Sequence, residues 1–191
     1  MNIIAACCRN RGIGLKGVLP WKFKKDLQYF KEITIGDGNN AVIVGNNTYR
    51  KLPVLPKRHT LVLTNNTSSK INTENTFFFN NVSTLKDFCK EKKYTDVWVA
   101  GGENVYNQFL LDPIVKALYL TTIDIDLPCD TFFPELPLRY VMTSKHATSE
   151  RGVNLSFEVY RNKTGGQYHK YKGTLLSSSM PDTFMPTGLN I

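Results

Sequence analysis

The chain has 191 residues, enough for one domain with a full core, and 41% of them are hydrophobic, as in ordinary globular proteins. No apolar run approaches the roughly 20 residues that a membrane-spanning helix needs, which argues against an integral membrane protein of that kind. The net charge of +8 favours anionic partners, but the basic residues are scattered and form no long block typical of nucleic-acid binding.

Short apolar runs alternate with amphipathic helical patterns, and several runs are apolar on both faces, as in a buried, mostly parallel sheet. The predicted strands are residues 3–8, 41–44, 60–64, 76–79, 97–100, 115–123, 140–147 and 153–161. The predicted helices are residues 23–34, 47–52, 83–92 and 103–110, with Ser83 or Thr84 as N-cap of the third. A short polar turn containing Glu150-Arg151-Gly152 joins the last two strands into an antiparallel hairpin. This order predicts a layered α/β domain.

The last part of the chain differs from the rest. Residues 164–191 lack periodic patterns and include Gly165-Gly166 and a run of three serines, which do not favour a packed core. We therefore expect one domain over residues 1–163 and a flexible tail over residues 164–191.

The four cysteines have neither the CxxC spacing nor the nearby histidines of a metal site, and we expect no metal and no disulfide framework. Reduced, mostly buried thiols are typical of intracellular proteins. The first apolar run is also too short for a signal-peptide core, and basic residues follow it rather than precede it. The sequence thus predicts a cytoplasmic protein.

Asp26 is a carboxylate where the local pattern calls for an apolar side chain. The apolar stripe of the helix predicted over residues 23–34 consists of Phe23, Leu27, Phe30 and Ile33. Asp26 lies within that stripe. A buried carboxylate is costly unless it is hydrogen-bonded or paired, which indicates a functional role. The alternatives are that Asp26 caps an early helical turn or forms an ion pair with Lys22.

Two predicted strands end in glycines that directly precede a helical pattern. The strand over residues 97–100 runs into Gly101-Gly102, and the strand over residues 41–44 runs into Gly45. Backbone N–H groups at a helix start carry a partial positive charge and can hold a phosphate. Neither segment matches the Rossmann fingerprint or the P-loop, so the pair favours an extended phosphate-bearing cofactor on another fold.

Three further features lie near these segments. Arg58 precedes an apolar strand and could clamp a carboxylate, although such an arginine is usually solvated. Trp21 comes just before the helix that carries Asp26, where core packing is the alternative to a functional role. The loop over residues 11–17 contains three glycines, which would let it move over a cleft.

These features belong to a longer ordered set of short segments. The set consists of Ile4-Ala5-Ala6, Gly12-Ile13-Gly14, Leu19-Pro20-Trp21, Asp26-Leu27-Gln28-Tyr29-Phe30, Val44-Gly45 with Thr48, Pro56-Lys57-Arg58, Gly101-Gly102 with Tyr106, Thr121, Asp130-Thr131-Phe132-Phe133-Pro134 and Phe157-Glu158-Val159-Tyr160. In order and spacing it resembles the dihydrofolate reductase family, and the resemblance covers residues 2–163. The resemblance implies a three-layer fold: a central, mostly parallel eight-stranded sheet with an antiparallel C-terminal strand, flanked by about four helices.

The resemblance also implies roles in substrate binding. Asp26 would be the buried carboxylate that binds the amino and ring nitrogens of the pterin and favours protonation at N5, and burial should raise its pKa. Trp21 would help to hold a water beside it, and Thr121 would support it from behind. Arg58 would clamp the α-carboxylate of the glutamyl tail. The other implied substrate contacts are Ile4, Ala5, Ala6, Leu27, Phe30, Leu52, Leu55, Ala100 and Tyr106.

NADPH is the cofactor that the resemblance implies. Its phosphate-binding segments would be Gly45-Asn46-Asn47-Thr48 and Gly101-Gly102-Glu103-Asn104-Val105, and the family commonly has a cis peptide bond between the paired glycines. The remaining implied cofactor contacts are Ala6, Ile13, Gly14, Leu19, Leu63, Thr64, Asn65, Ala100 and Tyr106.

The chain departs from the family at the positions that usually bind the 2′-phosphate of NADPH. The family has Arg or Lys there, whereas this chain has Asn46, Asn47, Thr64 and Asn65. These side chains can still donate hydrogen bonds, and Lys70 or a neighbouring lysine is another source of positive charge. NADPH is therefore expected, while the strength of its preference over NADH is open.

The implied reaction is reduction of 7,8-dihydrofolate to 5,6,7,8-tetrahydrofolate, with hydride to C6 and a proton to N5, in support of one-carbon metabolism and thymidylate synthesis. Because some members are fused to thymidylate synthase, we expect a functional link to that enzyme. The alternatives are a related pyrimidine reductase of riboflavin synthesis and a catalytically weak relative that binds folate or RNA. Asp26, Trp21, Arg58 and the paired glycines together favour the active dihydrofolate reductase.

Overall fold

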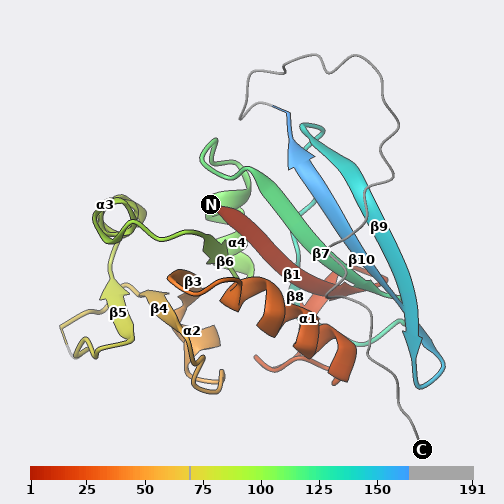
Figure 1. Ribbon diagram of the computed structural model, residues 1–191. Coiled ribbons are helices and arrows are strands. Elements are labelled where there is room, and N and C mark those ends of the chain that lie inside the picture. The colour runs from red at the N-terminus through yellow and green to blue at the C-terminus, as the bar shows by residue number, and fades with distance from the viewer. Residues whose placement is uncertain (69, 164–191) are drawn as a thin grey trace, which may run out of the picture.

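A twisted eight-stranded sheet forms the centre of the computed structural model, which describes residues 1–68 and 70–163 (Figure 1). Its strands are β1 Asn2–Cys8, β3 Asn40–Gly45, β4 Arg58–Leu63, β5 Thr76–Phe79, β6 Val97–Val99, β7 Ala117–Ile123, β9 Tyr140–Glu150 and β10 Val153–Asn162. They lie in the order β5-β4-β3-β6-β1-β7-β10-β9. Strand β10 runs in the direction opposite to that of the other seven strands of this sheet. The tail predicted over residues 164–191 lies outside the described residues.

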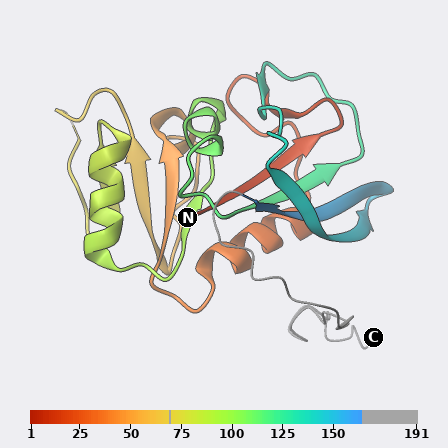
Figure 2. The same ribbon diagram turned by 90° about the horizontal axis from the view of Figure 1, so that it is seen from above.

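Helices cover both faces of this sheet, so the described domain has three layers (Figure 2). The helices are α1 Lys24–Ile35, α2 Asn46–Tyr49, α3 Val82–Lys92 and α4 Glu103–Leu110. Side chains of α1 and α2 pack into the apolar cluster on one face, and those of α3 and α4 pack into the cluster on the other. The fold class predicted from the sequence is therefore confirmed.

The central strands are apolar on both sides because each one is covered twice. Along β1 and β3, alternate residues enter opposite clusters: Ile3 and Ile43 pack towards α4, whereas Ile4, Val42 and Val44 pack towards α1. This is the burial pattern that a continuous apolar run predicts in a parallel sheet.

The structure adds elements and corrects boundaries. A small antiparallel pair, β2 Gly12–Gly14 with β8 Thr131–Phe132, was not predicted because neither short segment is a continuous apolar run. The N-cap of α3 is Asn81, not Ser83 or Thr84: its Oδ1 accepts a hydrogen bond of 2.8 Å from the Thr84 N–H. The second helix covers only Asn46–Tyr49 rather than residues 47–52.

The C-terminal end of α1 is fixed by Asn40, the first residue of β3. The Nδ2 of Asn40 donates to the carbonyl oxygens of Thr34 and Ile35 at 3.3 and 2.9 Å, and its Oδ1 accepts from the Asp96 N–H at 2.9 Å. The side chain is only 3% exposed, so these backbone groups have little access to water as a substitute partner. Asn40 thus ties the end of α1 to the sheet.

Asn40→Ala should lower the free energy of unfolding by about 2–4 kcal/mol, because it leaves buried backbone donors and acceptors without partners. Urea denaturation followed by circular dichroism measures the change. The matched control is Asn107→Ala on the exposed side of α4, for which a change within about 0.5 kcal/mol is expected. Equal destabilisation by both variants would contradict this account.

Candidate active site

Asp26 lies in the first turn of α1 and is only 7% exposed. Burial raises the pKa of its carboxyl above the ordinary value, while a hydrogen bond from the Thr121 hydroxyl on β7 and the dipole of the nearby Trp21 indole oppose that shift. The buried indole Nε1 of Trp21 nevertheless has no direct hydrogen-bond partner among the described residues. An unused donor beside a buried carboxylate is suited to hold a water between the two groups.

Neither alternative for Asp26 holds. The first N–H groups of α1, those of Lys24 and Lys25, donate to Glu150 of β9 rather than to Asp26. No ion pair joins Asp26 to Lys22 in the described part of the chain. Asp26 is therefore a buried carboxylate without a neighbouring counter-ion, which is the type of group that is tuned in functional sites.

Apolar residues surround one side of this carboxylate. The cluster on the α1 face brings together five of the predicted substrate contacts, namely Ile4, Phe30, Leu52, Leu55 and Ala100. Leu27 is 44% exposed, so the apolar stripe of α1 is not wholly buried and part of it faces solvent. Ala6 and Trp21 pack in an adjoining cluster with Phe23. The result is an apolar region that is open along the Leu27 side of α1.

Ala5 and Tyr106 were predicted to contact the substrate, but their side chains lie on the α4 face of the sheet rather than on the α1 face. Ala5 packs in the cluster on the α4 face because successive strand residues point to opposite sides, so it offers only its backbone to the α1 face. Tyr106 packs in the same cluster, and its hydroxyl donates to the Ile4 carbonyl oxygen at 2.9 Å. Ile13 and Leu63 also pack against that cluster.

Arg58 is buried, in contrast to the usual solvated arginine. It is 6% exposed, and its Nη1 donates to the Lys31 carbonyl oxygen at 3.1 Å and to the Thr34 hydroxyl, both on α1. Its guanidinium lies 5.6 Å from the ring centre of Phe30, and its Nε has no partner in the described residues. Burial lowers the pKa of the guanidinium. A desolvated cation with an unused donor is a fixed site for an anion.

The two glycine turns are joined. The Gly45 N–H donates to the Gly101 carbonyl oxygen at 2.7 Å, and the Gly101–Gly102 peptide bond is cis. Gly101 has a φ of +105°, and a Cβ there would lie 2.9 Å from the Tyr106 ring. A Cβ on Gly102 would lie 3.2 Å from the Thr48 hydroxyl. Only glycine therefore lets these turns approach each other so closely.

The helices that follow these two turns, α2 and α4, begin without a side-chain cap. Neither Gly45 before α2 nor Gly102 before α4 provides a side-chain cap, so the first N–H groups of both helices can bind an anion. The buried Oδ1 of Asn46 also has no partner within the described ranges. These two starts, held together by one hydrogen bond, fit a ligand with more than one phosphate.

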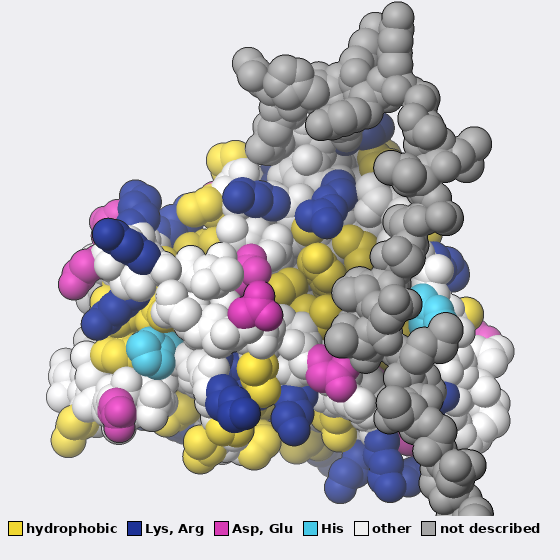
Figure 3. Space-filling view, in the orientation of Figure 1, with side chains coloured by type: hydrophobic (Ala, Val, Ile, Leu, Met, Phe, Trp, Pro, Cys, Tyr) yellow, Lys and Arg dark blue, Asp and Glu magenta, His cyan; other side chains and the backbone are white. Residues whose placement is uncertain are grey.

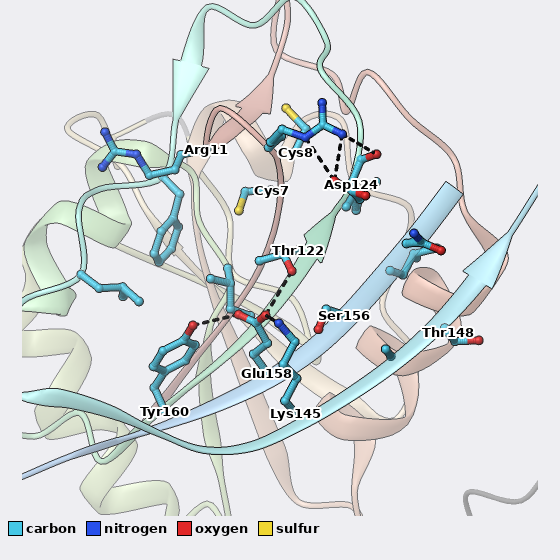
Figure 4. Close-up of a pocket in the computed structure, with 18 of the residues that line it drawn as sticks. Cys7, Cys8, Arg11, Thr122, Asp124, Lys145, Thr148, Ser156, Glu158 and Tyr160 are labelled. Atoms are coloured by element: carbon cyan, nitrogen blue, oxygen red, sulfur yellow. Dashed lines mark hydrogen bonds and ion pairs between the residues drawn. The ribbon is translucent and has the colours of Figure 1, made fainter. Parts of the chain in front are cut away.

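A separate cavity of about 1060 Å³ is lined in part by Leu120 and Phe133, which pack in the cluster on the α4 face (Figure 4). At its centre Glu158 accepts hydrogen bonds from Thr122 at 3.3 Å and Tyr160 at 2.8 Å and forms an ion pair of 3.0 Å with Lys145. None of the predicted substrate or cofactor contacts lines it. The charge of Glu158 is already compensated by Lys145, in contrast to the buried charges of Asp26 and Arg58.

The described residues give no indication of a metal site or of a membrane-spanning helix. On the face that Figure 3 shows, Lys and Arg side chains are dispersed among acidic and apolar groups rather than gathered into one patch. Residues 1–68 and 70–163 contain no cluster of three or more His, Cys, Asp or Glu side chains arranged for a metal ion. None of their helices has the length and hydrophobicity of a transmembrane helix.

Comparison with known proteins agrees with the resemblance found in the sequence. Residues 1–162 match the family model described as dihydrofolate reductase. A dihydrofolate reductase of Drosophila melanogaster is 34% identical over 145 residues, 71% of this chain and 80% of that protein. One from Heliothis virescens is 33% identical over 178 residues, 84% of this chain and 96% of that protein. A bifunctional dihydrofolate reductase-thymidylate synthase of Zea mays is 35% identical over 70% of this chain and 28% of its own length.

Asp26→Asn should raise the melting temperature at pH 7 by an amount on the order of a few °C. Because the folded protein raises the pKa of Asp26, it holds a proton that the unfolded chain has lost, and stability falls as pH rises from about 4 through the folded pKa. Asparagine removes this penalty. The gain measured by calorimetry should shrink as the pH is lowered towards about 4, and a variant less stable than wild type at pH 7 would contradict the assignment.

Proposed function

The chain belongs to the dihydrofolate reductase family, and we propose that it reduces 7,8-dihydrofolate to 5,6,7,8-tetrahydrofolate with NADPH. The observation that carries the proposal is the buried Asp26 carboxylate, which lies beside the indole N–H of Trp21; within residues 1–68 and 70–163 the carboxylate has no counter-ion and the indole has no direct hydrogen-bond partner. Such a carboxylate accepts hydrogen bonds from two adjacent N–H groups, the arrangement that the amino and ring nitrogens of a pterin present.

Asp26 then controls the proton that the reaction consumes. Its raised pKa means that the carboxyl holds a proton at a higher pH than an exposed aspartate would, so it favours protonation of the substrate at N5. Trp21 would hold the water through which that proton moves, and Thr121 would keep the carboxylate oriented. The apolar cluster around Ile4 and Phe30 would exclude other water from the reacting ring.

Arg58 would bind the opposite end of the substrate. Its guanidinium is held by Lys31 and Thr34 of α1, and its unused Nε supports a role as a donor to the α-carboxylate of the glutamyl tail. Leu52 and Leu55 pack in the same apolar cluster and would contact the aminobenzoyl group between the two ends. A riboflavin-type pyrimidine reductase would not be expected to need Asp26 and Arg58 together.

The residues at the glycine turns fit NADPH. Bound NADPH supplies the hydride for C6. The uncapped starts of α2 and α4 would hold its phosphates, and the buried Oδ1 of Asn46 would accept a hydrogen bond from one of its hydroxyl or amide groups. The remaining contacts follow the family pattern at Ala6, Ile13, Gly14, Leu19, Leu63, Thr64, Asn65, Ala100 and Tyr106.

Lys70 is the residue that we propose as the source of positive charge for the 2′-phosphate. Its Nζ lies 5.6 Å from the ring centre of Phe78, which pairs with Val62, two residues before Thr64. A lysine at this edge of the sheet would partly replace the Arg or Lys that the family usually has at Asn46 or Asn65. The preference for NADPH over NADH would then be weaker than in members that keep those cations.

The proposal extends to the cellular compartment of the enzyme, its link to thymidylate synthase and the bounds of its domain. The four cysteines are free thiols, which is typical of proteins in a reducing compartment, and we infer that this protein is located in the cytosol. Relatives that carry thymidylate synthase on the same chain support a functional link to that activity. We also propose that the reductase domain comprises residues 1–163.

Asp26→Asn should lower turnover about 10²-fold or more near neutral pH and less at low pH, where N5 is protonated without help. The decrease in absorbance at 340 nm with NADPH and dihydrofolate measures the rate. Asp37→Asn, in an exposed loop, is the control and should retain wild-type turnover. The same fractional loss at every pH would contradict the role of Asp26. Failure of folded wild-type protein to turn over would favour a folate- or RNA-binding relative.

Asn46→Arg should raise the ratio of NADPH affinity to NADH affinity about tenfold, because it restores a charge-assisted hydrogen bond to the 2′-phosphate. Fluorescence titration of both cofactors against the folate-free protein measures that ratio. Asn107→Arg adds the same charge on the exposed side of α4 and should leave it unchanged. An unchanged ratio in Asn46→Arg would contradict the placement of the 2′-phosphate.

A further inference from the structure

Helix α1 begins without a cap from its own sequence. The residue at its N-cap position is Phe23, whose backbone is extended and whose side chain cannot accept a hydrogen bond. The first N–H groups of a helix have no partner within the helix, and a missing cap usually leaves the first turn poorly fixed. Asp26 lies in this first turn, so the position of its carboxylate depends on what replaces the cap.

Glu150 replaces it from a distant part of the chain. Its Oε1 accepts from the Lys24 N–H and its Oε2 from the Lys25 N–H, each at 3.0 Å. These hydrogen bonds lower the pKa of Glu150, which keeps its carboxylate charged. A negative charge at this position is also stabilised by the helix dipole. One carboxylate thus satisfies two neighbouring donors at the start of α1.

The hairpin between β9 and β10 determines where Glu150 lies. Arg151 and Gly152 both have positive φ, at 53° and 77°, as a tight two-residue turn requires, and Glu150 pairs with Val153 across it. Glu150 is therefore the last residue of β9, at the tip of the hairpin beside the start of α1 (Figure 1).

A second contact joins the same two elements. The Lys25 Nζ donates to the Thr148 hydroxyl at 2.6 Å and to the Ser149 carbonyl oxygen at 2.9 Å, both on β9. The first turn of α1 is thus connected to β9 through its backbone and through one side chain. Asp26 follows Lys25 directly in the sequence and points instead towards Thr121 on β7.

We propose that Glu150 is a positioning residue for Asp26: its carboxylate caps the first turn of α1 and so holds the Asp26 carboxyl in place for dihydrofolate reduction. This role rests on the proposed function. It assigns a task to a residue outside the predicted substrate and cofactor contacts, and it makes the β9–β10 hairpin part of the catalytic apparatus.

The charges around Asp26 make this role measurable. Burial is the main cause of the raised pKa of Asp26, and the negative charge of Glu150 raises it further. The hydroxyl of Thr121 on β7 and the indole of Trp21 lower it. Cys7 on β1, Tyr29 on α1 and Tyr106 on α4 have pKa values raised mainly by burial, with a smaller contribution from Asp26. Removing the charge of Glu150 should therefore lower the pKa of Asp26.

The test compares Glu150→Gln with wild type in two independent measurements. Carbon-13 NMR titration of the Asp26 carboxyl in the ligand-free protein should show a pKa lowered by on the order of half a unit. The limb of the kcat profile against pH that Asp26 controls should move to lower pH by a similar amount. Glu150→Ala, which also removes both acceptors, should lower kcat several-fold further at neutral pH.

Two control variants separate positioning from general effects. Glu91→Gln removes the same charge from the exposed face of α3 and should leave the titration of Asp26 unchanged. Thr148→Val removes the hydroxyl that Lys25 contacts without changing a charge, and it should also leave that titration unchanged. Circular dichroism and thermal melts establish that each variant is folded.

The outcomes are distinguishable. A Glu150→Gln protein that loses thermal stability but keeps the wild-type titration of Asp26 and the wild-type pH profile would overturn the proposal, because Glu150 would then be a structural cap alone. An equal shift in Glu91→Gln would overturn it as well. Absence of turnover in folded wild-type protein would instead refute the proposed function, and the NMR titration would still decide whether Glu150 and Asp26 are linked.

Discussion

The burial of one uncompensated carboxylate, Asp26, is the constraint on which the arrangement of the site depends. Removing a charge from water is unfavourable unless fixed dipoles replace the solvent, and here the Thr121 hydroxyl supplies one of them. The group must also be held still for those dipoles to act. Helix α1 is accordingly fixed at both ends by residues from elsewhere in the chain, by Glu150 at its start and by Asn40 at its end.

The doubly covered sheet provides the rigid support for this helix. Because alternate residues of β1 and β3 enter opposite apolar clusters, these strands are fixed from both sides. The carboxyl ends of the neighbouring strands β3 and β6 hold the two glycine turns in contact. A site built in this way needs few polar side chains, which agrees with the small number of ionisable groups around Asp26.

Much of this arrangement was predictable from the sequence because it follows from periodicity and local turn chemistry. The apolar runs identified the eight strands of the central sheet, and the acidic residue within the apolar stripe of α1 identified Asp26. The contacts of Glu150 and Asn40 were not predictable, since they join residues that are far apart in the chain and each side chain looks like an ordinary surface polar group. The burial of Arg58 depends in the same way on Lys31 and Thr34, which only the packing of α1 against β4 brings close.

Helix α1 also determines the distance between Asp26 and Arg58. Asp26 projects from its first turn, and Arg58 is held by Thr34 in its last turn, eight residues later. At 1.5 Å per residue the two positions are about 12 Å apart along the helix axis. The spacing between a buried anion and a buried cation is thus determined by helix geometry rather than by flexible loops. In the proposed mode of binding, a ligand whose two polar ends have another separation can reach only one of these two groups.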